Sequence, residues 1–412
     1  MALCRQWLDS LPLPQGVLKK VQQEGRETIL RTGLPTKDLE AWRLTDLNRF
    51  RTVLELPTSQ NKTKKREENY HTWANPPQEG IRIVLETENN NIESIALPSG
   101  LRELNSTELK EHLTKNSNHP EFNKDDIALA INQAATKEVL ALKVEGNNVP
   151  PVELIMPASD NALNPTRVII VIEEKAELQL LQVALASDSS AHSHLIELHL
   201  KKNSKVEHGF VALGGGQGSC LANLSIKQES YSDYSLTSVQ HGWLLSRIEP
   251  RIVQLNGKGN TTLKGLQVST KNQQLCTNSI VHFEGPEGSL NQLQKAAAIE
   301  NSHSIFNGVI KVPQIAQKTN ASQLSRNLLL SNLARIDTKP ELEIIADDVR
   351  CTHGATVSQL QADELFYLRS RGINAKQAAG LLLEGYCQEI IDALPTDASR
   401  WDLINKLVDS FE

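Results

Sequence analysis

Short apolar runs with a period of two fill roughly two hundred residues of this chain, from about residue 138 onward. Asn, Gly, Ser, Asp and Lys separate them, which predicts strand–turn–strand repeats. No convincing amphipathic helix lies between them, so a parallel sheet with helical crossovers is excluded. The runs are ALKVEG, VELIMP, RVIIVIEE, ELQLLQVAL, HLIELHLKK, KVEHGFVAL, CLANLSIKQ, YSLTSVQHG, RIVQLNG, TLKGLQVST, SIVHFEG, GVIKVP and ELEIIADD.

Three all-β architectures remain: a sandwich, a barrel and a β-helical solenoid. Two hundred residues is large for a single sandwich, and the strand spacing drifts without a fixed repeat. Many runs nevertheless place apolar residues inside and polar residues outside on both flanks of a turn. A β-helix fills its stacked coils with Val, Ile and Leu and accommodates this pattern. The pattern favours the solenoid slightly over the sandwich.

Helical patterns flank the β-rich region on both sides. We expect a mostly helical region with a polar loop at 1–137, a β core at 138–356 and a helical domain at 357–412. In the first region a helix should end at Gly33, and a short helix near Glu40 should turn Trp42 inward. The charged, turn-rich segment 58–80 predicts a loop whose lysine run is a solvated surface.

The last sixty or so residues predict three short helices. The first stops at Gly372, the second opens with Asn374 as its N-cap and Gln377 three residues later, and the third carries Trp401 and Phe411 on one face. Such a group either caps the β core or receives another protein, and the pattern does not choose between these roles.

Composition narrows the class of protein. A net charge of −6 argues against a general nucleic-acid binder, and no apolar run approaches a membrane span. The amino terminus has no secretory h-region, so we expect an intracellular, cytoplasmic protein. The five cysteines are scattered without a CxxC pair, which indicates free thiols in a reducing compartment.

Several segments resemble known functional motifs but do not meet the requirements of those motifs. The glycine-rich segment 214–219 lacks the Lys and the following helix of a phosphate loop, and NGKGNTT lacks its first glycine, so the chain has no nucleotide-binding fingerprint. His192 and His194 share a strand face, with His199 nearby. Their polar neighbours favour a solvent-facing surface pair over a set of metal ligands.

The segment RCTHGAT carries the most chemistry. Cys351 and His353 stand two residues apart on an extended segment, and Asp347 and Asp348 precede them. Thiolate and imidazole suit iron or zinc. Two ligands do not close a site, so within one chain a buried thiol and a hydrogen-bonded His near a tight turn are the favoured interpretation. A metal site requires a second chain to complete it.

The segment from Asp347 to Tyr386, DDVRCTHGATVSQLQADELFYLRSRGINAKQAAGLLLEGY, closely resembles the C-terminal signature of the SufB/SufD family of the Suf iron–sulfur cluster assembly machinery. Upstream, Glu40, Trp42, Arg43, Thr45, Asp46 and Leu47 match the family's E-x-WR-x-T-D-L element. The resemblance covers essentially the whole chain. The stretch before Asp347 has no cysteine where the SufB branch carries one, so the resemblance is to the SufD branch.

The resemblance implies a right-handed parallel β-helix flanked by helical regions, acting as a non-catalytic scaffold. It implies pairing with SufB through the β-helix and binding of the SufC ATPase through C-terminal helices, where Leu365, Phe366, Tyr367, Arg369, Arg371 and Gly372 lie. His353 becomes a proposed interface ligand of a nascent iron–sulfur cluster shared with SufB, with Cys351 as an auxiliary. A reduced flavin is associated with such complexes, but no flavin motif is present here.

The resemblance also leaves alternatives open. The β-helix edge that would pair with SufB is offered equally to a second copy of the chain. The family occurs in the cytoplasm and, for organellar members, in the plastid stroma. A purely structural adaptor of the same complex would differ only in what His353 does. A carbohydrate-active β-helix enzyme is remote, since Asp and Glu are spread over the turns rather than clustered on one outer face.

Overall fold

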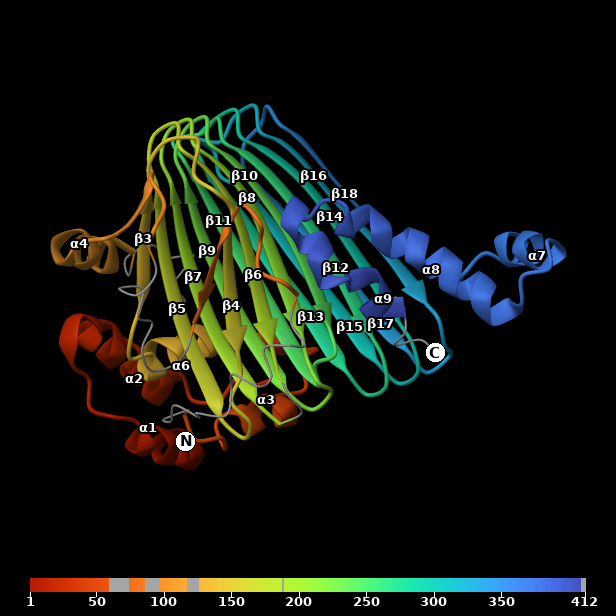
Figure 1. Ribbon diagram of the computed structural model, residues 1–412, viewed down its shortest axis with the longest axis horizontal. Helices are drawn as coiled ribbons and strands as arrows, with labels where there is room; N and C mark the ends of the chain where they lie inside the picture. Colours follow the sequence, from red (N-terminus) through yellow and green to blue (C-terminus); the bar gives the residue numbers. More distant parts are fainter. Residues whose placement is uncertain (59–73, 86–95, 117–125, 187–188, 409–412) are drawn as a thin grey trace.

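The computed structural model describes residues 1–58, 74–85, 96–116, 126–186 and 189–408. Its strands form two nine-stranded sheets, and from β3 onward successive strands alternate between them (Figure 1). Neighbouring strands within each sheet run parallel, apart from β2 and β3. The chain therefore winds as a parallel β-solenoid with terminal helices, which confirms the fold class expected from the sequence.

We call the two layers the odd sheet and the even sheet. The odd sheet contains β2 (Leu101–Glu103), β3 (Leu140–Val144), β5 (Leu163–Ile172), β7 (Ala191–Leu200), β9 (Ser219–Gln228), β11 (Leu245–Leu255), β13 (Gln274–Glu284), β15 (His303–Val312) and β17 (Arg335–Ile344). The even sheet contains β1 (Ile81–Val84), β4 (Val152–Pro157), β6 (Glu177–Leu185), β8 (Lys205–Leu213), β10 (Asp233–His241), β12 (Asn260–Ser269), β14 (Ser289–Ala298), β16 (Asn320–Leu329) and β18 (Arg350–Ser358).

One row of turns is closed by residues with positive φ. Lys175, Asn203, Tyr231 and Lys258 each adopt φ near +60° (63°, 59°, 61° and 58°). The backbone N–H of each residue donates to a carbonyl of the next coil, as Tyr231 does to Lys258 at 3.0 Å. A residue in the left-handed conformation reverses the chain sharply, and the hydrogen bond to the next coil offsets part of the strain of that conformation. These turns hold successive coils in register.

Two strands differ from expectation. β14 and β16 show too little apolar alternation to predict a strand, yet they pair along their full lengths with their neighbours. The reason is that most of their inward positions carry polar side chains. Gln292, Gln294, Gln323 and Asn327 are all buried there. The Gln323 amide donates to the Gln292 carbonyl at 2.8 Å, so amides and hydroxyls replace aliphatic packing.

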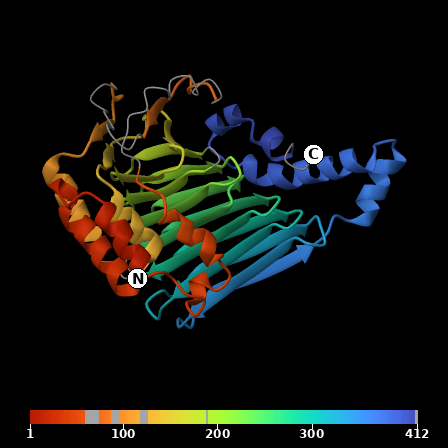
Figure 2. The same cartoon turned by 90° about the horizontal axis from the view of Figure 1, so that it is seen from below.

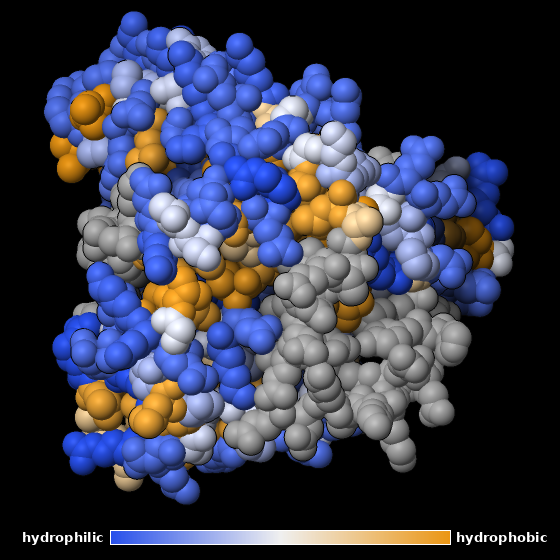
Figure 3. Space-filling view, turned by 60° about the vertical axis from the view of Figure 1, so that its left-hand side comes forward, coloured by the Kyte–Doolittle hydropathy of each residue, from blue (hydrophilic) through white to orange (hydrophobic). Residues whose placement is uncertain are grey.

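The first helices cover one side of the odd sheet. They are α1 (Ala2–Ser10), α2 (Lys19–Thr32), α3 (Leu47–Val53), α4 (Ser106–Asn116) and α6 (Ile127–Ala135), with short 3₁₀ turns at Gly16–Leu18 and Glu40–Trp42. α2 ends at Gly33 with φ of 68°, as predicted. Figure 3 brings the N-terminal end of the molecule forward and shows hydrophobic residues in the middle of the view with hydrophilic ones around them. Most of the predicted polar loop lies outside the described residues.

Arg247 contacts the segment around Trp42 at several points. The Arg247 guanidinium lies 3.9 Å from the centre of the buried Trp42 ring. The same group donates to the Ala41 carbonyl at 2.9 Å and to the Thr45 hydroxyl at 3.1 Å. A stacked, hydrogen-bonded Arg of this kind stabilises through both packing and charge. The Glu40–Leu47 element is therefore an anchor that ties the N-terminal helices to the solenoid.

A buried carboxylate pair lies beside this anchor. Asp126 caps α6 through the Ala128 and Leu129 N–H groups, and its second oxygen contacts Arg251. Glu249 lies between Arg247 and Arg251. Burial, together with the nearby Glu249, raises the pKa of Asp126 to about 6 from 3.8. Since this folded-state pKa exceeds the unfolded value, ionising Asp126 costs folding free energy.

We expect the contribution of Asp126 to wild-type stability to fall as the pH rises from 4 to 7, by up to about 3 kcal/mol. The contribution is fully present below the unfolded pKa and is lost as the pH passes about 6. Asp126→Asn keeps a side chain suited to the N-cap and should remove this contribution, so the stability of the variant relative to wild type should rise across this pH range. Urea unfolding of both proteins across that range measures it. Parallel pH profiles would contradict the assignment.

Three C-terminal helices follow the solenoid: α7 (Ala362–Ser370), α8 (Ala375–Ile391) and α9 (Leu403–Val408), with a 3₁₀ turn at Thr396–Trp401. α8 and α9 pack on the outer face of the even sheet. Leu383, Cys387, Ile390 and Trp401 join the outward side chains of the even sheet in one buried cluster. Asn374 caps α8 through the Gln377 N–H, as predicted, while Phe411 lies outside the described residues. Among the described residues, no helix is both long and apolar enough to cross a bilayer.

Candidate functional site

The solenoid is open at its C-terminal end. β17 and β18 are the last strands of their sheets, so each has one edge without a neighbouring strand in the described chain. Figure 2 shows this end opposite the N-terminal helices. Large apolar side chains are exposed here: Val357 (45%), Ile345 (67%) and Leu333 (73%). An exposed strand edge with apolar residues is a typical surface for pairing with another chain.

The backbone at this edge is arranged for strand pairing. Arg350 donates its N–H to Thr319 on the β16 side. Because successive peptide groups of a strand alternate in direction, Cys351, His353, Ala355 and Val357 turn their N–H and C=O groups to the free edge. In β17, Arg335 donates toward β15, so Pro340 takes a free-edge position, where its missing N–H breaks no bond within the chain. β18 therefore offers the more complete edge.

Cys351 and His353 share one face of β18, as predicted, and that face continues the interior of the solenoid. Cys351 follows Ala321 in register and packs, half-buried, against the main core. Burial raises the pKa of its thiol, partly offset by contact with the Ala321 backbone. His353 follows Gln323 in register and is exposed, because no further coil covers it. The pair is half-covered and faces the open end.

The residue that pairs with His353 in the preceding coil, Gln323, has a buried polar atom without a hydrogen-bond partner among the described residues. Gln323 is 2% exposed and its amide nitrogen is used by Gln292, while its carbonyl oxygen Oε1 has no partner among the described residues. A buried acceptor without a partner is costly. Sequence patterns did not single out Gln323. In the described residues no three His, Cys, Asp or Glu side chains gather closely enough to hold a metal, so no third such side chain joins Cys351 and His353.

The prediction of a solvent-facing histidine pair was wrong. His192 and His194 share a face, but that face points into the core and both are fully buried. His194 bonds to the Thr166 hydroxyl at 2.7 Å and to Gln182 at 3.0 Å, and His192 Nε2 lies 3.0 Å from the Leu185 carbonyl. Burial lowers the pKa of His194 to about 3, so it is neutral. Both residues are internal structural histidines.

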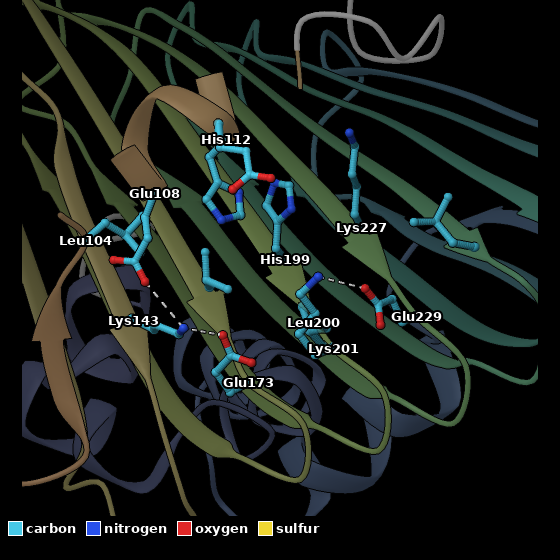
Figure 4. A pocket seen from close by; sticks show the side chains of 13 residues that line it. Leu104, Glu108, His112, Lys143, Glu173, His199, Leu200, Lys201, Lys227 and Glu229 are labelled. Atoms are coloured by element: carbon cyan, nitrogen blue, oxygen red, sulfur yellow. Dashed lines mark hydrogen bonds and ion pairs between the residues drawn. The ribbon is translucent and has the colours of Figure 1, made fainter. Parts of the chain in front are cut away.

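His199 lies on the outer face of the same strand, in a pocket of about 460 Å³ beneath α4 (Figure 4). Its ring meets His112 edge-on, with the centroids 4.9 Å apart. At the rim, Lys143 pairs with Glu173 at 2.7 Å and Lys201 pairs with Glu229 at 2.9 Å. The described lining has no Trp, Tyr or Phe face for a flavin ring to stack on, so we assign no flavin to it.

α7 projects away from the body beyond the end of α8 (Figures 1 and 2). None of its residues is buried, and Phe366 (74%) and Tyr367 (57%) are large hydrophobic side chains exposed on it. Leu365 is half-buried, while Arg369 and Arg371 are exposed. Arg371 lies 5.3 Å from the Tyr367 ring centre, and Gly372, with φ of 88°, turns the chain toward α8. The helix presents an aromatic and basic surface that its own chain leaves open.

Comparisons with known proteins agree on one family. A family model described as SUF system FeS cluster assembly, SufBD core domain, matches residues 155–386, more than half of the chain. An iron–sulfur cluster assembly SufBD family protein of Synechocystis is 38% identical over 239 residues, which is 56% of this chain and 53% of that protein. The chain thus spans about half the length of that relative.

Two further relatives differ in coverage. The protein named ABCI7, chloroplastic, of Arabidopsis thaliana is 27% identical over 411 residues, covering 95% of this chain and 86% of that protein. The iron–sulfur cluster assembly protein SufD of Escherichia coli is 35% identical over 175 residues, which is 42% of this chain and 41% of that protein. Every one of these matches includes the solenoid or part of it.

Proposed function

The chain belongs to the SufB/SufD family, and from that premise we propose that it is a non-catalytic scaffold subunit in iron–sulfur cluster assembly by the SUF system. In this proposal each segment has its own role. Residues 1–137 pack against the solenoid and stabilise it, residues 138–356 pair with a related subunit, and residues 357–412 bind an ATPase. Relatives named for bacteria and for the chloroplast are consistent with action in the cytoplasm or the plastid stroma.

The open end is the surface that we propose for SufB. Its free β18 backbone groups can extend the even sheet into a second solenoid, and the exposed apolar residues around it would be covered. The observation that carries the proposal is the position of Cys351 and His353 on this same edge. A partner that pairs there brings its own side chains within reach of both.

At this interface, His353 would supply one ligand to a nascent cluster, and Cys351 would stand beside it. Imidazole and thiolate are ligands that iron accepts. The half-covered setting suits a transient product, because two ligands from one chain hold a cluster only while the partner supplies the rest. The cluster is cargo here and not a resident cofactor.

The proposed ATPase site is the α7 surface, with Leu365, Phe366, Tyr367, Arg369, Arg371 and Gly372. Two exposed aromatic rings beside arginines are a composition enriched at binding hot spots. The ATPase, which we identify as SufC on the family premise, would contribute the nucleotide chemistry. Co-expression with SufB and SufC followed by co-purification tests the assembly, and failure of this chain to join the complex would refute it.

The rate at which a thiol reagent labels Cys351 would report directly on the SufB interface. It is the only one of the five cysteines that is not buried, so a thiol reagent should label it first in the isolated chain. Burial raises the pKa of its thiol, which slows the reaction relative to a free cysteine. Pairing with SufB should slow labelling further, by about tenfold or more, because the interface excludes the reagent. Mass spectrometry of the peptides measures this.

Two outcomes would redirect the proposal. Equal labelling of Cys351 with and without SufB would place the partner elsewhere. Protection that appears in the isolated chain as its concentration rises would indicate that a second copy occupies the same edge. A complex that forms normally but holds undiminished iron and sulfide after His353→Ala would leave the chain as a structural adaptor.

A further inference from the structure

Tyr386 connects the C-terminal helices to two strands at the open end. It lies on α8, and its hydroxyl is 2.6 Å from the Arg326 carbonyl of β16 and 3.2 Å from the Ala296 carbonyl of β14. A tyrosine hydroxyl has one proton to donate, so the shorter contact, to Arg326, takes the main share. Arg326 stands opposite Thr356 of β18, three residues beyond His353.

Lys295 strengthens the same contact from the sheet side. It lies on β14 and is 3% exposed, which is rare for a lysine. Its ammonium group donates to the Tyr386 carbonyl at 2.8 Å, pairs with Glu389 of α8 at 2.5 Å, and lies 4.4 Å from the Tyr386 ring centre. Because the buried Lys295 ammonium makes all three of these contacts, it fixes the position of α8 on the sheet, both along the strands and across them.

The rest of the contact between α8 and the sheet has a different character. Leu383, Cys387 and Ile390 pack on the outward apolar residues of the even sheet. Apolar packing is largely non-directional, whereas hydrogen bonds fix direction and register. Tyr386 and Lys295 are therefore the points where movement of α8 must be followed by β14 and β16.

We propose that Tyr386 and Lys295 form a mechanical latch that passes movement of α7 and α8 to β16 and its neighbour β18. This inference rests on the proposed docking of an ATPase on α7. α8 has 17 residues and is a rod of about 25 Å, so a force on its projecting end acts directly on the latch. A nucleotide-driven shift of the ATPase would then change the edge that carries His353. Tyr386 and Lys295 are positioning residues and touch no substrate.

Hydrogen–deuterium exchange of the complex with SufB and SufC tests the latch. With the wild-type chain, a non-hydrolysable ATP analogue should change amide exchange across 350–358 by about fivefold, the scale of one hydrogen bond. Tyr386→Phe keeps the ring and should abolish this change while the affinity for SufC stays the same. Lys295→Met should act similarly. Tyr231→Phe, on an exposed turn far along the chain from α8, is the matched control and should respond like wild type.

Each outcome decides the matter. Loss of the nucleotide response in both latch variants, with SufC still bound at wild-type affinity, supports the latch. A wild-type response in Tyr386→Phe and Lys295→Met overturns it and leaves the proposed function intact. A wild-type complex that binds SufC but shows no nucleotide response in β18 overturns it as well. If the wild-type chain does not bind SufC, both the latch and the proposed docking site fall together.

Discussion

An Ala355→Pro variant is expected to lose SufB while keeping its own fold. Ala355 directs its backbone N–H to the free edge of β18, so proline there removes a donor that the chain itself does not use. The added ring would also obstruct an approaching strand. Together these effects should cost about 3 kcal/mol of binding, which is roughly a hundredfold loss of affinity. Titration of SufB against the labelled chain measures it.

Matched substitutions separate the lost donor from general damage. Ala355→Val keeps the N–H and suits a strand, so it should pair nearly as well as wild type. Thr356→Pro removes a bond to β16 and should lower the unfolding temperature, which Ala355→Pro should leave almost unchanged. Pro340 shows that the chain already carries proline at a free-edge position of β17. Undiminished SufB binding by Ala355→Pro would mean that the subunits do not pair through this edge.

The second large effect is expected at α7. Replacing both Phe366 and Tyr367 with Asp should weaken SufC binding by about a thousandfold, since two hot-spot aromatics commonly carry about 2 kcal/mol each. Neither side chain is buried within its own chain, so the unfolding temperature should change little. Isothermal titration with SufC gives the affinity, and thermal unfolding provides the stability control.

A second exposed apolar site provides the comparison for α7. Leu333, at the solenoid's open end, is as exposed as Phe366, so Leu333→Asp should leave SufC binding unchanged. It should instead weaken SufB. If the α7 variant binds SufC normally, the ATPase docks elsewhere. If Leu333→Asp and the α7 variant both lose SufC, the two surfaces do not act separately.

Much of the fold could be predicted because coil interiors are largely aliphatic. The alternation in VELIMP and ELQLLQVAL corresponds to β4 and β6 residue for residue. β14 and β16 were not predicted because their inward positions carry Gln, Ser and Asn, several of which hydrogen-bond to polar side chains of their own or a neighbouring coil. A hydropathy pattern reveals which side of a strand is apolar. It does not reveal hydrogen bonds between side chains about thirty positions apart in neighbouring coils.

The candidate site was predictable only in part. Spacing placed Cys351 and His353 on one face, but it could not show that β18 is the last strand, which is why His353 is exposed. The histidines of β7 were mispredicted because their polar neighbours suggested solvent. Thr166 of the adjacent strand β5 and Gln182 of β6 in the other sheet bond to His194, and the Leu185 carbonyl bonds to His192. Tyr386 and Lys295 gave no local signal, because their contact joins positions 91 residues apart.

The central claim is that His353 holds a cluster at an interface that needs a partner. Its most direct measurement is the iron and acid-labile sulfide bound to the complex with SufB and SufC, purified anaerobically after assembly in cells. The wild-type complex should carry both elements, and His353→Ala should assemble with the same subunit ratio while losing most of them. Equal iron and sulfide in the two complexes would contradict the ligand role of His353.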